Sequence, residues 1–130
     1  RIEVPTVITN LVDRPNDGGG VIEASWLPAE DAAWHAYRLY VWDSTADPSW
    51  EPSREDLGSF STYIRSGFWS RTNATITRAD NAGVTEELRD DRQYRAAVVI
   101  EYADGSLGVP MTYPQNISPT DEVPAAPDWT

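Results

Sequence analysis

The residue types that perform most enzyme chemistry are scarce in this chain. His35 is the only histidine, and the chain contains neither cysteine nor lysine. No serine lies in a Gly-x-Ser-x-Gly elbow, and neither an HExxH motif nor a phosphate-binding P-loop occurs. A catalytic triad built on His35 would need partners that no spacing in the sequence indicates. We therefore predict that the protein is not an enzyme and that His35 lies in a loop.

Acidic clusters raise calcium binding as a second kind of chemistry. Calcium takes about six to eight convergent oxygen ligands, and none of the clusters has EF-hand spacing. Asp and Asn are also common in turns, because their side chains bond to the nearby backbone. We expect no cofactor, with calcium at an acidic turn or a module junction as the alternative. The clusters are Asp13 with Asn16 and Asp17, Glu30 with Asp31, and Asp90 with Asp91.

The tryptophans are the most informative side chains, because a small domain cannot bury all six of them. Trp26 is expected in the core. Exposed aromatic residues flanked by polar ones mark surfaces that bind a sugar, a neighbouring module or a subunit. The alternative is that residues 43–71 fold back and bury their own aromatic side chains as a satellite cluster. The candidate interaction surface comprises Trp42, Trp50, Phe68, Trp69 and Trp129.

Two asparagines lie in N-glycosylation sequons. Asn73-Ala74-Thr75 and Asn116-Ile117-Ser118 both have the required form. Asn73 is expected at the start of an exposed strand, and Asn116 in a linker. Glycosylation at these positions would fit an extracellular or cell-surface address.

The charge of the chain excludes two classes of partner. There are 21 acidic residues against 10 basic ones, all of them arginine, which gives a net charge of -11. A strongly negative field repels nucleic acid and anionic membrane surfaces. No apolar run reaches the roughly 18–20 residues that span a bilayer. We expect neither nucleic-acid binding nor membrane insertion.

Alternation with a period of two predicts the strands that must position these side chains. It is clearest over residues 94–102, where Tyr94, Ala96 and Val98 share one face and Arg95, Ala97 and Val99 the other. The sequence predicts a loop over 43–56, one or two short edge strands within 57–70, and a polar loop over 79–87. Further strands are predicted over 3–12, 21–26, 36–42, 72–78 and 107–113.

Two local motifs indicate how the strands connect. Leu88, the polar turn 89–93 and Tyr94 have the form of a tyrosine corner, in which the phenol bonds to backbone a few residues upstream. Asp104-Gly105 between two strand-like runs indicates a tight turn. Both motifs are typical of a β-sandwich.

The run 13–28, with its core Trp26, resembles the A–B turn and B strand of fibronectin type III domains. Residues 37–41 resemble their C strand, and Leu88 and Tyr94 match the residues before their F strand. The resemblance covers about residues 4–113. It implies an all-β, antiparallel β-sandwich of about seven strands, here with an enlarged C–E connection.

This organisation leads to a prediction of domains and function. Residues 1–114 are expected to form the fibronectin type III-like domain, with an insertion at 43–71, and residues 115–130 a proline-rich linker or assembly tail. We predict an extracellular structural or adhesive module of a microbial surface or filament-forming protein, assembling with its own copies or with neighbouring modules. The alternative is a carbohydrate-binding accessory module of a secreted glycoside hydrolase.

Overall fold

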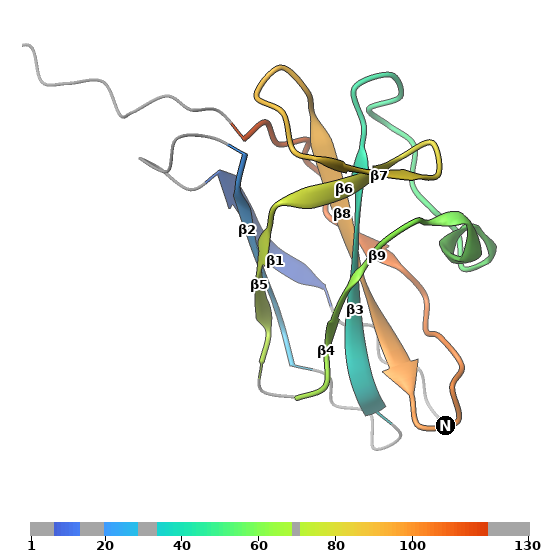
Figure 1. Ribbon diagram of the computed structural model, residues 1–130. Helices are drawn as coiled ribbons and strands as arrows, with labels where there is room; N and C mark the ends of the chain where they lie inside the picture. The colour runs from blue at the N-terminus through green and yellow to red at the C-terminus, as the bar shows by residue number, and fades with distance from the viewer. Residues whose placement is uncertain (1–6, 14–19, 29–33, 69–70, 120–130) are drawn as a thin grey trace, which may run out of the picture.

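Two sheets pack face to face in the computed structural model, which describes residues 7–13, 20–28, 34–68 and 71–119 (Figure 1). Their strands pair antiparallel, except that β3 and β6 pair in parallel. The first sheet has the strand order β1-β2-β5. The second has the order β7-β6-β3-β8-β9, and β4 also pairs with β3. The all-β sandwich predicted from the sequence is confirmed. No described helix is long and apolar enough to span a bilayer.

The elements follow the predicted alternation closely in the centre of the chain and less closely outside it. The central pair, β3 and β8, keeps antiparallel register from Ala36↔Glu101 to Asp43↔Tyr94, and the register shifts once before Ala36. The strands are β1 (Ile8–Asp13), β2 (Ile22–Trp26), β3 (Trp34–Asp43), β4 (Ile64–Ser66), β5 (Asn73–Ile76), β6 (Arg78–Asn81), β7 (Val84–Glu87), β8 (Tyr94–Tyr102) and β9 (Met111–Thr112), and a 3-10 helix, η1, spans Glu55–Ser59.

The core lies between the two sheets and is built from alternate residues of each strand. Tyr37, Leu39 and Val41 of β3 face Trp26 of β2, whose ring meets Tyr37 edge-on at 5.6 Å. The expectation that Trp26 belongs to the core is confirmed. Every residue of β8 is buried, so this strand is covered on its outer face as well. Something other than the first sheet must therefore lie against that face.

The tyrosine corner is confirmed. The backbone N–H of Arg89 donates to the Tyr94 hydroxyl at 2.9 Å, and Leu88 is buried in the core. Burial raises the pKa of Tyr94 from its ordinary value of 10, so the hydroxyl stays protonated at neutral pH.

Removing that hydroxyl should destabilise the domain measurably. We expect Tyr94→Phe to lower the free energy of unfolding by about 1–2 kcal/mol, because the Arg89 N–H loses its acceptor. Urea unfolding followed by fluorescence measures the difference. Tyr113→Phe is the matched control, because the Tyr113 hydroxyl makes no hydrogen bond within the described residues; an equal loss in both variants would contradict the assigned role.

The prediction of a polar loop over 79–87 is wrong. One residue, Thr77, separates β5 from β6. Strands β6 and β7 form a hairpin. This hairpin belongs to the second sheet, where Asp80 of β6 pairs with Trp42 of β3. The hairpin turn places Ala82 and Gly83 at φ 51° and 87°. Both values lie in the left-handed region that two-residue hairpin turns require, and Gly83 adopts it without strain.

The packed domain extends past the boundary expected at residue 114. Tyr94 and Ile117 exchange two backbone hydrogen bonds of 2.8 Å each, and Ile117 packs on the core. Pro119 is fully buried, and its carbonyl accepts from Gly20 at 3.4 Å. Residues 115–119 therefore belong to the domain. The remainder of the predicted tail, 120–130, lies outside the described residues.

Candidate functional site: an aromatic and acidic groove

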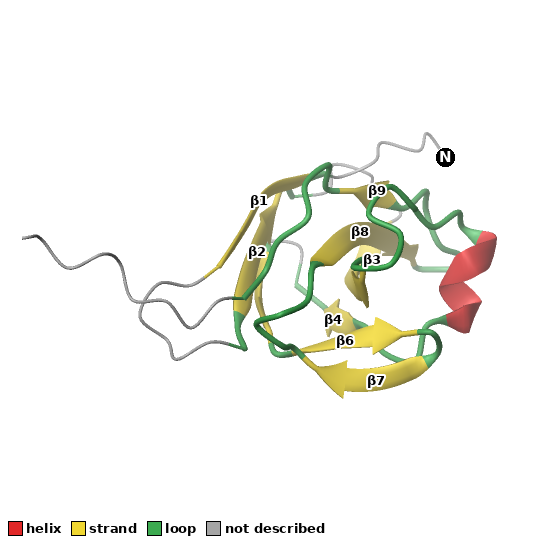
Figure 2. Ribbon diagram, turned by 90° about the horizontal axis from the view of Figure 1, so that it is seen from above, coloured by secondary structure: helices red, strands yellow, loops and turns green. Residues whose placement is uncertain are grey.

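The insertion between β3 and β4 covers the outer face of the second sheet. Its η1 helix lies on the side of β3 and β8 that faces away from β1 and β2 (Figure 2). Leu57 of η1 is buried there against Tyr40 and Val99, with Phe60 and Leu107 packed around them. This satellite cluster explains why β8 is buried on both faces.

Three aromatic rings of the insertion and β3 stack at one end of this cluster. The Trp50 ring meets Trp42 edge-on at 5.6 Å and lies nearly parallel to Phe60 at 6.4 Å. Phe60 also meets Trp42 and Tyr40 edge-on, at 5.8 and 5.1 Å. Edge-to-face contacts of this kind stabilise aromatic pairs beyond the area that they bury. Trp50 is therefore held in one orientation although it is 39% exposed.

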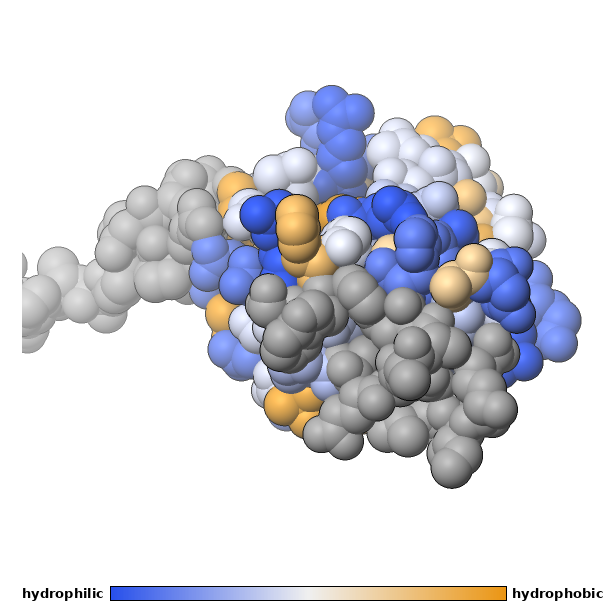
Figure 3. Space-filling model, turned by 90° about the horizontal axis from the view of Figure 1, so that it is seen from below, coloured by the Kyte–Doolittle hydropathy of each residue, from blue (hydrophilic) through white to orange (hydrophobic). Residues whose placement is uncertain are grey.

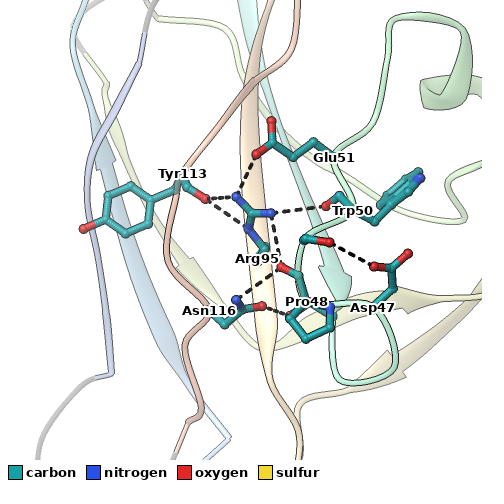
Figure 4. A network of polar contacts seen from close by, with 9 residues as sticks. Asp47, Pro48, Trp50, Glu51, Arg95, Tyr113 and Asn116 are labelled. Carbon is teal, nitrogen blue, oxygen red and sulfur yellow. Dashed lines mark hydrogen bonds and ion pairs between the residues drawn. The ribbon is translucent and has the colours of Figure 1, made fainter.

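Arg95 of β8 holds the backbone of the insertion beneath these rings (Figure 4). Its guanidinium, only 3% exposed, donates to the carbonyls of Pro48 and Trp50 at 3.3 Å each. It also donates twice to the Tyr113 carbonyl, at 2.9 and 3.2 Å, and to Glu51 at 3.1 Å. A guanidinium has five donors in a rigid fork, and here all its contacts converge on the insertion and on the segment after β9.

A second polar network connects β4, near the end of the insertion, to β3 and β8. Glu101, 10% exposed, accepts from Arg38 and Arg65 at 2.8 Å each. Arg65 first, and then Arg38, lower the pKa of Glu101 from 4.5 to about 2. The Arg38 guanidinium also lies 4.4 Å from the centre of the Tyr63 ring and donates to Tyr40 at 3.1 Å.

The β6–β7 hairpin forms the other wall of the site. Asp80, 9% exposed, accepts from the backbone N–H and the hydroxyl of Ser61, at 2.9 and 2.6 Å, and from the Gly83 N–H at 3.4 Å. Thr85 donates to the Ser61 hydroxyl at 2.9 Å. These bonds fix the hairpin turn against the insertion, next to the Trp50 ring.

A groove in two adjoining parts runs between the insertion and the hairpin, and Trp50 lines both parts. One part has a cavity volume of about 330 Å³ and is lined by Trp42, Asp43, Asp47, Trp50, Asp80 and Ala82. The adjoining part, of about 270 Å³, shares Trp50, Asp80 and Ala82 and adds Phe60 and Asp56. We call the two parts together the Trp50 groove. It combines indole rings with carboxylates, which suits a polar or cationic guest that also offers a flat or apolar surface.

The structure separates the tryptophans and phenylalanine predicted as an interaction surface. Trp42 is only 4% exposed and lies under Trp50, so it packs rather than presents a surface. Trp50 is partly exposed in the groove. Phe68 is 62% exposed at the end of β4, against Arg71 and away from the satellite cluster. Trp69 and Trp129 lie outside the described residues.

The satellite cluster that the sequence offered as an alternative does form, with a different membership. Trp42 and Trp50 belong to it as expected, and Phe60, Tyr40 and Leu57 pack with them. Phe68 is exposed instead, and Trp69 lies outside the described residues. The carboxylates Asp47 and Asp80 were missed as site residues. Asp80 had no signal in the sequence, because its position depends on a hairpin that crosses between sheets.

The two sequons lie in different surroundings. Asn73, the first residue of β5, is exposed. Asn116 is half-buried: its amide nitrogen donates to the Pro48 carbonyl at 3.3 Å, and its amide oxygen accepts from Ser44. A glycan on Asn116 would be attached to the nitrogen that donates to Pro48, whereas one on Asn73 would extend into solvent. Glycosylation at either position stays a prediction.

The remaining candidate residues that the structure describes do not converge on a site. His35 is exposed on β3 rather than in a loop. Among the described residues no three His, Cys, Asp or Glu side chains are grouped so as to hold a metal ion. Asn16, Asp17, Glu30 and Asp31 of the proposed calcium turns lie outside the described part of the chain.

The lower end of the molecule offers no comparable feature on the part that is visible. Figure 3 views this end and shows apolar residues as small separate patches among hydrophilic ones. Isolated apolar residues of this kind are normal on protein surfaces. The Trp50 groove remains the strongest candidate site in the described structure.

Comparisons with known proteins bear on the fold. No protein-family model matches the sequence, and no curated protein matches it significantly. Among solved structures, the solution structure of the fn3 domain of the human collagen alpha-1(XX) chain is similar over 95% of this chain and 90% of that one, with 15% identity and a TM-score of 0.48. The strand order and the tyrosine corner of the chain itself describe a fibronectin type III-like β-sandwich.

Proposed function

We propose that the chain is a non-catalytic structural and adhesive module of an extracellular or cell-surface, filament-forming microbial protein, and that it acts through protein–protein assembly. The observation that carries the proposal is the edge strand β7. All four of its residues are exposed, and within the described structure it pairs on one side only, with β6. An edge of this kind accepts a strand from a partner chain.

The free edge of β7 presents backbone groups in a predictable pattern. The hairpin has a two-residue turn, so Asn81 and Val84, which flank it, form a hydrogen-bonded pair. The next residue, Thr85, then directs its N–H and carbonyl away from β6, and Glu87 does the same. These groups are available to an added strand.

A proline at this position tests the proposal. Thr85→Pro removes the outward N–H without removing a bond of the β6–β7 ladder, so we expect association to weaken at least several-fold. Multi-angle light scattering over a concentration series measures it. Association should also strengthen with salt, because copies with a net charge of -11 repel each other.

Thr85→Val is the matched control for this substitution. It removes the hydroxyl that bonds to Ser61 but keeps the backbone N–H. Edge pairing predicts normal association for Thr85→Val and weak association for Thr85→Pro. Equal association in both variants, or a monomer at all concentrations in the unsubstituted chain, would remove self-assembly through β7 from consideration. Deleting 123–130 tests in the same assay whether the tail supplies the strand.

One observation favours a carbohydrate-binding accessory module as the second candidate. Trp50 is partly exposed beside the Asp47 carboxylate, and sugars bind to aromatic rings flanked by polar groups. Retention on insoluble polysaccharides, competed by the soluble sugar and lost in Trp50→Ala, would support this reading against the assembly module.

A further inference from the structure

Asp80 is an anionic side chain in the Trp50 groove that has no cationic partner in the described structure. It is 9% exposed and is held by the N–H groups of Ser61 and Gly83 and the hydroxyl of Ser61. Asp43, by contrast, is paired with Arg92 at 3.3 Å, and Glu51 with Arg95. Charges that are nearly buried are usually paired. A partner molecule could therefore supply the cation that Asp80 lacks.

Asp47 adds a second carboxylate on the open side of the groove. It accepts one weak bond, from the Ser49 hydroxyl at 3.4 Å, and forms no ion pair among the described residues. Figure 4 shows the Asp47 carboxylate and the Trp50 ring on the same side of the insertion, away from Tyr113. A guest in the groove would meet both groups together.

The aromatic wall supplies a partner for the flat face of a cation. Trp50 is fixed by Trp42 and Phe60 and remains 39% exposed. Tryptophan is the best aromatic partner for a cation over its ring. Trp42 also lines the groove, and its buried indole N–H has no acceptor within the described residues. The groove thus offers a cation the exposed part of the Trp50 ring.

We propose that the Trp50 groove binds an arginine side chain of a partner polypeptide, with the guanidinium over Trp50 and bonded to Asp47 and Asp80. The inference rests on the proposed role in protein–protein assembly and names the chemistry of the contact. Arginine fits better than lysine, because its planar guanidinium stacks on an indole and reaches two acceptors at once. The net charge of -11 favours encounter with a basic partner over a second copy of this chain.

The groove suits an arginine better than a sugar ring or a metal ion. A neutral sugar would leave the Asp47 and Asp80 carboxylates without a cationic partner. A metal ion needs several convergent ligands, and no such group occurs among the described residues. An arginine guanidinium, with its donors in fixed positions, would pair with both Asp47 and Asp80.

A pair of synthetic peptides tests the proposal on the whole chain. The probe is a capped Gly-Ser-Arg-Gly-Ser-Arg-Gly-Ser peptide, and its control carries citrulline, which is uncharged and has nearly the same shape, in place of arginine. Titration is followed by tryptophan fluorescence and by the indole N–H signal of Trp50, assigned with Trp50→Phe. We expect saturable binding of the arginine peptide, at least ten-fold weaker binding of the citrulline peptide, and loss of affinity with rising salt.

Substitutions then place the binding in the groove. Asp47→Asn should weaken the arginine peptide several-fold, and Trp50→Ala at least ten-fold. Glu55→Gln removes the same charge from an exposed residue that does not line the groove, and its affinity should be nearly unchanged. Should Trp50→Ala perturb folding, Asp47→Asn still decides the outcome, because Asp47 is exposed and makes one weak contact.

Three results would overturn the proposal: no saturable shift at millimolar arginine peptide, equal binding of the citrulline peptide, or equal losses in Asp47→Asn and Glu55→Gln. A Trp50 signal that shifts with soluble oligosaccharides instead would reassign the groove to carbohydrate. Because assembly through β7 is measured separately with Thr85→Pro, its failure and the failure of the groove are distinguishable.

Discussion

Arg95→Ala should lower the free energy of unfolding by about 3–5 kcal/mol, the largest effect that we expect from any single substitution in this domain. The guanidinium is almost completely buried and supplies the donors for three carbonyls, those of Pro48, Trp50 and Tyr113. Removing it leaves the Trp50 and Tyr113 carbonyls without a donor, and the Pro48 carbonyl keeps only its bond from Asn116. It also opens a cavity between β8 and the insertion.

The loss of stability in Arg95→Ala should come from the broken hydrogen bonds to the carbonyls rather than from the broken ion pair with Glu51. Glu51, the anionic partner of Arg95, is 57% exposed, and exposed ion pairs contribute little. Glu51→Gln should therefore cost no more than about 0.5 kcal/mol. Urea denaturation of both variants gives the comparison. If Arg95→Ala costs no more than Glu51→Gln, the insertion is held by its aromatic packing and not by Arg95.

Arg95→Ala should also change the Trp50 groove. The residues on either side of Trp50 lose their anchor, so the indole emission of the folded variant should shift toward that of exposed tryptophan. The arginine peptide should bind it less tightly than the unsubstituted chain, because the groove is no longer held in one shape.

The second large effect is a loss of stability in acid through Glu101. Its pKa is lowered from 4.5 to about 2 by Arg65 and Arg38, so the folded state binds this proton less readily than the unfolded state. The contribution is therefore fully present above pH 4.5 and is lost as the pH falls toward 2. A shift of this size corresponds to about 3 kcal/mol, which we reduce to about 2 kcal/mol because Arg65 is 45% exposed and its charge is screened.

Glu101→Gln isolates this contribution. At pH 7 the variant should be less stable by about 2 kcal/mol, and the difference should shrink as the pH approaches 2, because Glu101 of the unsubstituted chain is then protonated too. Urea unfolding at a series of pH values measures it. Glu55→Gln, an exposed control on η1, should change stability little. A stability difference between Glu101→Gln and the unsubstituted chain that is independent of pH would contradict the ion-pair explanation.

Both networks serve the same structural purpose. Arg95 holds the part of the insertion around Trp50, and Glu101 holds the part at β4. Both residues lie on the outer face of β8. The sheet thereby carries a second layer on its outer face, and that layer places Trp50 opposite the β6–β7 hairpin. The groove depends on these anchors as much as on its own side chains.

Local regularity made the sandwich itself predictable. The alternation in 94–102 placed Tyr94 and Val98 on one face of the strand and Arg95 and Val99 on the other, and the structure confirms this division. The tyrosine corner was visible because Leu88, the turn and Tyr94 act within a few residues of one another. Patterns of this kind depend on strand periodicity and short-range contacts, which the order of residues records directly.

The hairpin at 78–87 was not predicted from the sequence, because its turn contains a residue that is unusual in such turns. Two-residue hairpins are normally signalled by Asn-Gly or Asp-Gly at the two turn positions. Here Ala82 occupies the first of them at φ 51°, a conformation that alanine seldom adopts. The bonds from Ser61 and Gly83 to Asp80 hold the turn in place, and Ser61 belongs to a distant part of the chain.

The site was decided by tertiary structure alone. The sequence indicated that residues 43–71 were unusual and rich in aromatic side chains, and it predicted that their tryptophans either pack or bind. Which of them does which depends on long-range contacts: Trp42 is covered by Trp50, and Trp50 is held at the surface by Arg95 of β8. Asp80 joins them from another element. The alternation of residues along the chain determined the sandwich, and contacts between distant segments determined the groove, because no local pattern encodes which loops meet.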